Sequence, residues 1–397
     1  MVASYEPADE KETVEAVTEA RSKGLPMEIA GGGTKRGLGR PIQAGAALSM
    51  AKLTGITLYE PAELVISAKA GTALADVEAA LDEKGQQLAF EPMDYGAIYG
   101  APAGRPSIGS VAACNLSGPR RIYAGAARDS LIGVRVVTGK GEAMKNGGRV
   151  MKNVTGYDLV KFSAGAFGTL GILTEVTFKV LPQAETTATL VFSGLDDESA
   201  RTLMSEALSS PFEITGAAHL PGLLGDEART LLRLEGFEAS ITYRIGELRR
   251  ELRSYGAPEV LDTEASKAEW RAIRDVKPLA ERVDGKALWR ISTAPTRAPS
   301  LARAIRTKTD ADLFYDWGGG LIWLTVPERS DAAEPVVRAA VAEAGGHATL
   351  VRASETIRAA IDVFEPLAEP VMALTRATKS VFDPDRILNP SRMYAGV

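Results

Sequence analysis

The segment Ala30 to Gly39, AGGGTKRGLG, constrains the fold of this chain more than any other stretch. It directly follows the short apolar run Met27 to Ile29, so we place it in the turn after a strand. Glycine loses more conformational entropy on folding than any other residue, and three in succession indicate a turn that needs bare backbone. The alternative is a permissive surface turn. Consecutive N–H groups with no Cβ in the way form a concave nest for an anion, and we therefore predict a phosphate-binding loop.

The two commonest glycine fingerprints do not fit this loop. A dinucleotide-binding GxGxxG pattern that started at Gly31 would need glycine at the position of Arg36. A Walker loop that started at Gly32 would need Lys and Ser or Thr where Leu38 and Gly39 stand. The sequence therefore gives little support to NAD or ATP as ligand.

Two further glycine-rich tracts give this loop its context. The tract 105–118 reads RPSIGSVAACNLSG, and small residues dominate it, so its backbone can also approach a ligand closely. The tract 165–178 reads GAFGTLGILTEVTF and continues as an alternating strand. Each tract alone is a weak signal, and their order and spacing make the pattern specific.

The order of these tracts resembles the FAD-binding half of the vanillyl-alcohol oxidase family, whose flavin domain is of the PCMH type. The resemblance rests on GGGT, on SIGSVAACNLSG with RRIYAG and a following RD, and on FGTLGILTEVTFKVLP. The C-terminal FDPDRILNPSRMY resembles the segment with which these proteins return to the flavin domain. Within the family, the chain is similar to the FAD-binding E subunits of bacterial glycolate oxidases over essentially all 397 residues.

The resemblance implies an α+β protein in three parts. Residues 1–183 would form the FAD-binding domain of two α/β subdomains, and residues 184–362 a substrate-type cap domain. Residues 363–397 would return to the FAD domain. The spacing of helices and strands after Thr187 itself predicts an open-faced sheet with helices on one side, in a rhythm that suggests a duplicated unit.

The resemblance also implies FAD-binding residues at matching positions. The first loop would surround the pyrophosphate, the second tract would lie along the diphosphate and flavin, and the third would meet the ADP moiety. The NPS turn near the C-terminus would approach the ring, with an ordinary Asx turn as the alternative. The implied residues are Gly31, Gly32, Gly33, Thr34, Lys35, Gly109, Ser110, Asn115, Ser117, Gly118, Gly171, Ile172 and Asn389.

Histidine and cysteine usage bears on how the flavin is held and on substrate chemistry. No histidine precedes His219, and Cys114 among small apolar residues is typical of packing, so we predict non-covalent FAD. Relatives that oxidise 2-hydroxy acids carry an HxGDGNxH metal and substrate signature. The only histidines here are His219 and His347, and neither has a second ligand at the required spacing. We therefore predict no metal site and no self-sufficient 2-hydroxy-acid site.

The catalytic residues stay unknown at this stage. Arg290 could bind a carboxylate, and Tyr315 or Trp317 could form the wall of a flavin pocket. Trp270 with Arg274 is a further pair of this kind. The alternative, which we favour, is that these residues pack in the sheet and on one helix face, as we expect for Trp289 and Trp323.

Composition excludes several partners. A net charge of −5 and no basic run argue against nucleic acid. The first residues show no secretory signal, no stretch approaches the roughly 20 apolar residues of a spanning helix, and a single cysteine cannot hold an iron–sulfur cluster. We expect a cytoplasmic protein that meets the inner face of the plasma membrane only through partners.

The resemblance implies a function within a complex. The chain would be the FAD subunit of a glycolate oxidase or dehydrogenase that converts glycolate to glyoxylate. Its partners would be a second FAD subunit with the substrate site and an iron–sulfur subunit that passes electrons onward. Two alternatives stay open: a self-sufficient FAD-dependent alcohol or sugar-lactone oxidase, and a structural subunit with an idle FAD.

Overall fold

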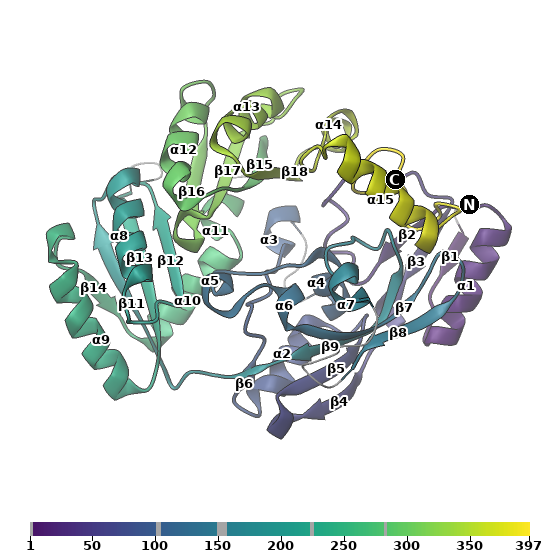
Figure 1. Ribbon diagram of the computed structural model, residues 1–397, viewed down its shortest axis with the longest axis horizontal. Coiled ribbons are helices and arrows are strands. Elements are labelled where there is room, and N and C mark those ends of the chain that lie inside the picture. The colour runs from purple at the N-terminus through teal and green to yellow at the C-terminus, as the bar shows by residue number, and fades with distance from the viewer. Residues whose placement is uncertain (1–2, 101–104, 149–156, 223–225, 282–283) are drawn as a thin grey trace. The chain divides into compact units, whose positions relative to one another are not determined.

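The computed structural model describes residues 3–100, 105–148, 157–222, 226–281 and 284–397, and Figure 1 shows its ribbon. The chain divides into two compact units. The first comprises residues 1–117, 125–182 and 362–397. The second comprises residues 118–124 and 183–361. The sequence did not predict that the short segment 118–124 joins the second unit.

The first unit contains two main sheets. The antiparallel sheet has the strand order β4-β5-β9-β7-β8. Successive residues of its inner strands point to opposite faces, and most of them are buried. The parallel sheet has the order β1-β3-β2 and delivers the chain into the first glycine loop. The strands are β1 (Ala3–Tyr5), β2 (Met27–Ala30), β3 (Ala46–Ser49), β4 (Ile56–Glu60), β5 (Val65–Lys69), β7 (Leu131–Val137), β8 (Ala143–Gly147) and β9 (Ile172–Lys179), with a small pair β6 (Gln86–Gln87) and β10 (Leu181–Pro182) beside them.

Helices cover the sheets of the first unit. The first helix begins after Asp9, whose carboxylate caps it by accepting from the Glu12 N–H at 2.8 Å. Its apolar side, with Val17 and Ala20, packs on the parallel sheet and on Leu388 near the C-terminus. The helices are α1 (Glu10–Ser22), α2 (Leu74–Asp82), α3 (Gly96–Tyr99), α4 (Ile108–Cys114), α6 (Ala127–Ser130), α7 (Leu159–Ser163) and α15 (Glu369–Phe382).

The second unit is built on one eight-stranded antiparallel sheet with the order β14-β11-β13-β12-β16-β17-β15-β18. Each half of this sheet is a βαββαβ motif whose strands have the same spatial order, fourth, first, third and second. The duplication is therefore visible in the topology. The first half is β11 (Thr186–Ser193), α8 (Asp197–Ser209), β12 (Gly216–Leu220), β13 (Arg229–Gly236), α9 (Glu238–Glu251) and β14 (Glu259–Leu261). The second half is β15 (Lys286–Ser292), α12 (Ala298–Arg306), β16 (Asp312–Asp316), β17 (Leu321–Pro327), α13 (Glu334–Ala344) and β18 (His347–Arg352). Outside the two halves lie α5 (Arg121–Ala124), α10 (Thr263–Arg274), α11 (Lys277–Ala280) and α14 (Glu355–Ala360).

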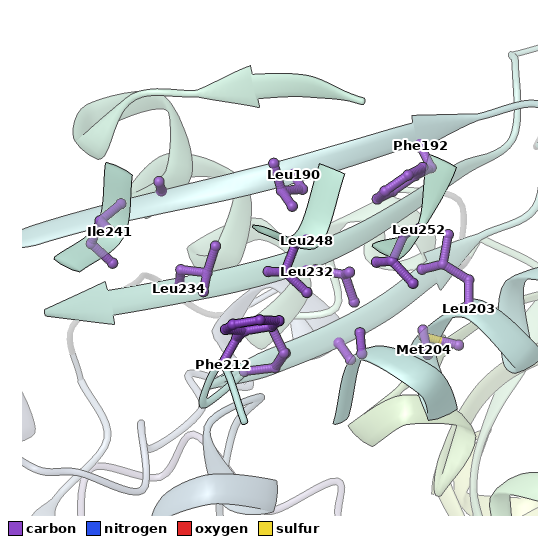
Figure 2. Close-up of a cluster of buried hydrophobic side chains, with 14 residues drawn as sticks. Leu190, Phe192, Leu203, Met204, Phe212, Leu232, Leu234, Ile241, Leu248 and Leu252 are labelled. Atoms are coloured by element: carbon purple, nitrogen blue, oxygen red, sulfur yellow. The ribbon is translucent and has the colours of Figure 1, made fainter. Parts of the chain in front are cut away.

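The sheet of the second unit is covered on both faces over its first half, which corrects the prediction that helices lie on one side. On one face, Leu190 and Leu232 pack against α8 and α9, as Figure 2 shows. Successive strand residues point to opposite faces, so Thr189 lies on the other face. There the Trp270 indole of α10 donates to the Thr189 hydroxyl at 2.9 Å. Helix α10 lies between the two duplicated halves in sequence, and its buried tryptophan brings it onto this second face.

The two halves of the sheet meet at the single residue pair His219 and Tyr315. Both side chains reach Asp197 at the start of α8. The Tyr315 hydroxyl donates to one carboxylate oxygen at 2.7 Å, and the His219 Nε2 lies 3.5 Å from the other. Arg306 lies 3.3 Å from the same carboxylate. Asp197 thus links the halves through side chains where backbone pairing is minimal.

We predict that this link depends on pH. Burial acts to raise the pKa of Asp197, but the His219 and Tyr315 side chains and the Arg306 charge outweigh it, so the net pKa lies below the usual value. A lowered carboxyl pKa contributes stability above the unfolded value of about 3.9, and this is lost as pH falls through the folded pKa. Asp197→Asn should therefore lower the free energy of unfolding at pH 7 by about 1.5–3 kcal/mol. Urea denaturation at pH 7 and pH 3 checks this, and an equal deficit at both pH values would contradict it.

Candidate functional site

The first unit contains a partly open cavity, the kind of concave site in which cofactors bind. Its wall includes four segments from distant parts of the sequence: the loop after β2, α4 with its preceding loop, the turn before β9, and the C-terminal segment after α15. Side chains of β7, β8, α7 and the end of α15 also line it. All but three of the predicted FAD-binding residues line this cavity: Gly31, Gly32, Gly33, Thr34, Lys35, Gly109, Ser110, Gly171, Ile172 and Asn389.

The glycines of the first loop have packing reasons in addition to the predicted one. A Cβ on Gly31 would lie 2.1 Å from the Ser107 hydroxyl, and one on Gly32 would lie 1.9 Å from the Arg105 carbonyl oxygen. Gly33 has a φ of +75°, a conformation that side chains disfavour. Packing against the loop at 105–107 therefore also requires glycine at Gly31 and Gly32. Their bare backbone lets two loops of the cavity wall approach closely.

Thr34 and Lys35 add polar groups to this wall. The Lys35 ammonium donates to the Ser110 hydroxyl at 3.1 Å and lies 3.4 Å from the Thr34 hydroxyl. Burial lowers the pKa of Lys35, and among the described residues it forms no ion pair with a carboxylate. A buried cation of this kind is stabilised by an anionic ligand. The loop therefore fits the diphosphate of a nucleotide cofactor.

The second tract contributes fewer cavity residues than predicted. Gly109 lies against Ala70, where a Cβ would come within 2.5 Å of the alanine methyl group. Asn115 and Ser117 instead organise the chain beyond α4, because their side-chain oxygens each accept a backbone N–H at 2.9 Å, from Arg128 and Ala127. Gly118 belongs to the second unit, where its carbonyl oxygen accepts the Trp317 indole N–H at 3.0 Å. These three residues do not line the cavity.

Asn389 joins two of the cavity loops rather than forming an ordinary Asx turn. Its side-chain oxygen accepts the Ile29 N–H at 2.8 Å, and its side-chain amide donates to the Phe167 carbonyl oxygen at 2.8 Å. Arg392, which the sequence interpretation missed, donates to the Lys35 carbonyl oxygen at 2.9 Å and lines the same cavity. Its place in the C-terminal motif SRMY was the available signal.

Cys114 lines the cavity without being an activated thiol. Burial raises its pKa more strongly than the nearby Lys35 and Arg392 charges lower it. The reactive form of cysteine is the thiolate, so this environment disfavours a covalent bond to a ligand.

The candidate catalytic residues of the second unit do not form one site. Arg290 lies opposite Trp323, and Trp323 lies opposite Phe314 on the next strand, so these three side chains share one face of the sheet. Tyr315 follows Phe314 in the sequence and therefore lies on the opposite face. Burial, and then the Asp197 charge, raise the pKa of Tyr315 well above its usual range, so its hydroxyl is no general base.

Arg290 and Trp317 do lie together. The Arg290 and Arg121 guanidinium carbons lie 5.0 and 4.5 Å from the centroid of the Trp317 ring. Trp317 has a φ of +54°, a strained conformation for a non-glycine residue, and the Asp316 carboxylate holds it by accepting its N–H. The second pair is structural, because Trp270 is buried under Arg233 and Arg274 pairs with Asp275. The expected strand residues Trp289 and Trp323 are buried as predicted.

The two histidines lie on different strands of the second unit. His219 is buried beside Thr230 and Asp197, and His347 is exposed at the start of β18. Among the described residues, no three His, Cys, Asp or Glu side chains gather in a metal-binding arrangement.

Comparison with known proteins identifies the family. Residues 3–147 match the family described as FAD binding domain. The chain is 35% identical to the glycolate oxidase subunit GlcE of Escherichia coli K12 over 382 residues, which cover 96% of each chain. This chain belongs to the GlcE family of FAD-binding oxidoreductases. The predicted cofactor, FAD, is thereby confirmed.

Two further proteins are similar to this chain. The chain is 29% identical to the glycolate oxidase subunit GlcD of Bacillus subtilis over 187 residues, 47% of this chain and 38% of GlcD. The structure of 4-ethylphenol oxidase from Gulosibacter chungangensis superposes with a TM-score of 0.69 at 14% identity, over 99% of this chain and 89% of that one. This likeness confirms the predicted vanillyl-alcohol oxidase-type fold. Among the described residues, no helix combines the length and apolar character that crossing a membrane requires.

We predict that Lys35 contributes directly to FAD affinity. Lys35→Met removes the buried charge while keeping a long side chain, and it should raise the FAD dissociation constant about tenfold or more. Quenching of flavin fluorescence on titration of the apoprotein measures this. Lys84→Met, at an exposed position outside the cavity, is the matched control and should bind FAD as the parent does. Equal affinities of the two variants would contradict the assignment.

We also predict that FAD is held without a covalent bond. Because the Cys114 thiol stays protonated, acid precipitation should leave all flavin in the supernatant. A yellow pellet that becomes colourless in Cys114→Ser would contradict this.

Proposed function

We propose that this chain is the FAD-binding subunit of a glycolate oxidase or dehydrogenase complex, which oxidises glycolate to glyoxylate. The observation that carries the proposal is the 35% identity to GlcE over 96% of both chains, together with a cavity whose wall suits a nucleotide diphosphate. Bound FAD supplies the redox chemistry by accepting two electrons, and the protein positions and tunes it.

Different residues of the cavity wall have different roles in holding FAD. The loop Gly31 to Lys35 binds the diphosphate through backbone N–H groups, the Thr34 hydroxyl and the Lys35 ammonium. Asn389 fixes the distance between that loop and the turn before β9. Apolar side chains such as Phe162 and Phe382, whose ring centroids are 5.3 Å apart, exclude water from the cavity wall.

The second unit acts as the cap domain, with residues 363–397 returning to the FAD domain. Arg290 beside Trp317 could bind a carboxylate, but we assign the oxidation of the 2-hydroxy acid to the site of a partner. Tyr315 is left out of this role because it lies on the other sheet face. The cap offers no metal-binding arrangement among its described residues, so a partner supplies the substrate site.

Partners are a second FAD subunit that carries the substrate site and an iron–sulfur subunit that takes the electrons onward. Membrane contact at the cytoplasmic face is made through them. The similarity to both GlcE and GlcD, named as subunits of glycolate oxidase, supports this assembly. Helix α15, drawn in yellow in Figure 1, carries Val371, Leu374 and Val381 on one side, with exposures of 50%, 67% and 60%. Such an apolar face suits contact with another subunit.

We predict that glycolate oxidation requires the complex. The isolated chain, with or without divalent metal, should reduce an artificial dye with glycolate at least about 100-fold more slowly than the co-expressed complex. Leu374→Asp should weaken assembly while leaving FAD binding unchanged, because Leu374 lies outside the cavity. Fast glycolate oxidation by the chain alone would overturn the subunit assignment.

A further inference from the structure

Helix α15 and its C-terminal cap residue carry a fully buried ion pair. The Lys379 ammonium lies 2.9 Å from the Asp383 carboxylate, and the two side chains are 1% and 0% exposed. Neither residue is part of the cavity wall. The attraction within a buried ion pair offsets the desolvation cost only where further hydrogen bonds satisfy both charged groups. The other hydrogen-bond partners of Lys379 and Asp383 therefore show which segments the pair connects.

Those partners come from two separate segments of the first unit. Lys379 donates to the Thr169 carbonyl oxygen at 2.7 Å and to the Leu388 carbonyl oxygen at 2.9 Å, which with Asp383 uses all three ammonium hydrogens. Asp383 accepts the backbone N–H groups of Ile387 and Leu388 at 3.1 and 2.8 Å. The pair therefore fixes the turn at 169 relative to the segment 387–388.

Both fixed segments continue directly into the cavity wall. The turn at 169 is flanked by Gly168 and Leu170, which line the cavity, and Leu388 precedes Asn389. Leu388 also forms a parallel bridge with Met27, which leads into Ile29 and the first glycine loop. The Asn389 side chain then spans from Ile29 to Phe167. A displacement of Leu388 would therefore move Asn389 and separate these two loops.

We propose that Lys379 and Asp383 are positioning residues for the FAD site. They act through Thr169, Leu388 and Asn389 and set the spacing between the diphosphate loop and the turn before β9. A pair that served only to stabilise α15 would need no bonds to Thr169 and Leu388, because an apolar pair fills such a place equally well. The inference rests on the proposed FAD site and adds to it two residues outside the cavity wall.

Two variants test the pair against a matched control. Lys379→Met and Asp383→Asn should each raise the FAD dissociation constant about tenfold or more, and flavin that stays bound should fluoresce more strongly. Glu235→Gln breaks another buried ion pair, Arg120 with Glu235 at 2.5 Å, in the second unit. This control should lower the melting temperature comparably and leave FAD affinity unchanged. Equal affinity losses in all three variants would overturn the proposal, because the effect would then follow stability alone.

A measurement on the parent protein covers the case in which the variants fail to fold. Addition of FAD to the apoprotein should slow amide hydrogen exchange at Ile387, Leu388 and Ile29, because the network connects these amides to the cavity. Unchanged exchange at Ile387 and Leu388 under saturating FAD would overturn the proposal. Failure of the parent to bind FAD at all would instead contradict the proposed function itself.

Discussion

The side chain of Asn389 makes the interaction on which the cavity depends. It accepts a hydrogen bond from the Ile29 N–H and donates one to the Phe167 carbonyl oxygen, so one amide group joins segments that are 360 and 222 residues away in sequence. Backbone pairing adds to this link, because the Met27 N–H donates to the Ile387 carbonyl oxygen at 2.6 Å and the Asn389 N–H donates to the Met27 carbonyl oxygen at 3.0 Å. Buried polar side chains, together with this short backbone pairing, therefore hold the loops of the cavity at fixed distances.

Close backbone approach is the second requirement, and it explains the glycine content of the cavity wall. Gly31 and Gly32 lie against the loop at 105–107, and Gly109 lies against Ala70. With any side chain at these positions, the loops would separate and their N–H groups would no longer converge on one place. Packing and ligand binding thus both favour glycine at these positions. The buried amine of Lys35, when protonated, favours an anionic ligand.

Local signals in the sequence were sufficient to predict the glycine loops, the strand that leads into the first of them, and most of the cavity residues. Glycine tracts, capping residues such as Asp9 and alternating strands each depend on a few neighbouring residues. The roles of Asn115, Ser117 and Gly118 could not be predicted in this way, because each depends on where a later segment passes. The covering of the second sheet face could not be predicted either, because it depends on the contact of Trp270 with Thr189, which is 81 residues away in the sequence.

The first unit contains the FAD-binding domain, and we propose that substrate chemistry requires a larger assembly. We also propose that FAD occupies the cavity with its diphosphate at the loop Gly31 to Lys35. A crystal structure of the chain with bound FAD tests this most directly. We expect diphosphate oxygens within hydrogen-bonding distance of the backbone N–H groups of that loop and of the Lys35 ammonium. FAD bound elsewhere, or a diphosphate that does not contact this loop, would contradict it.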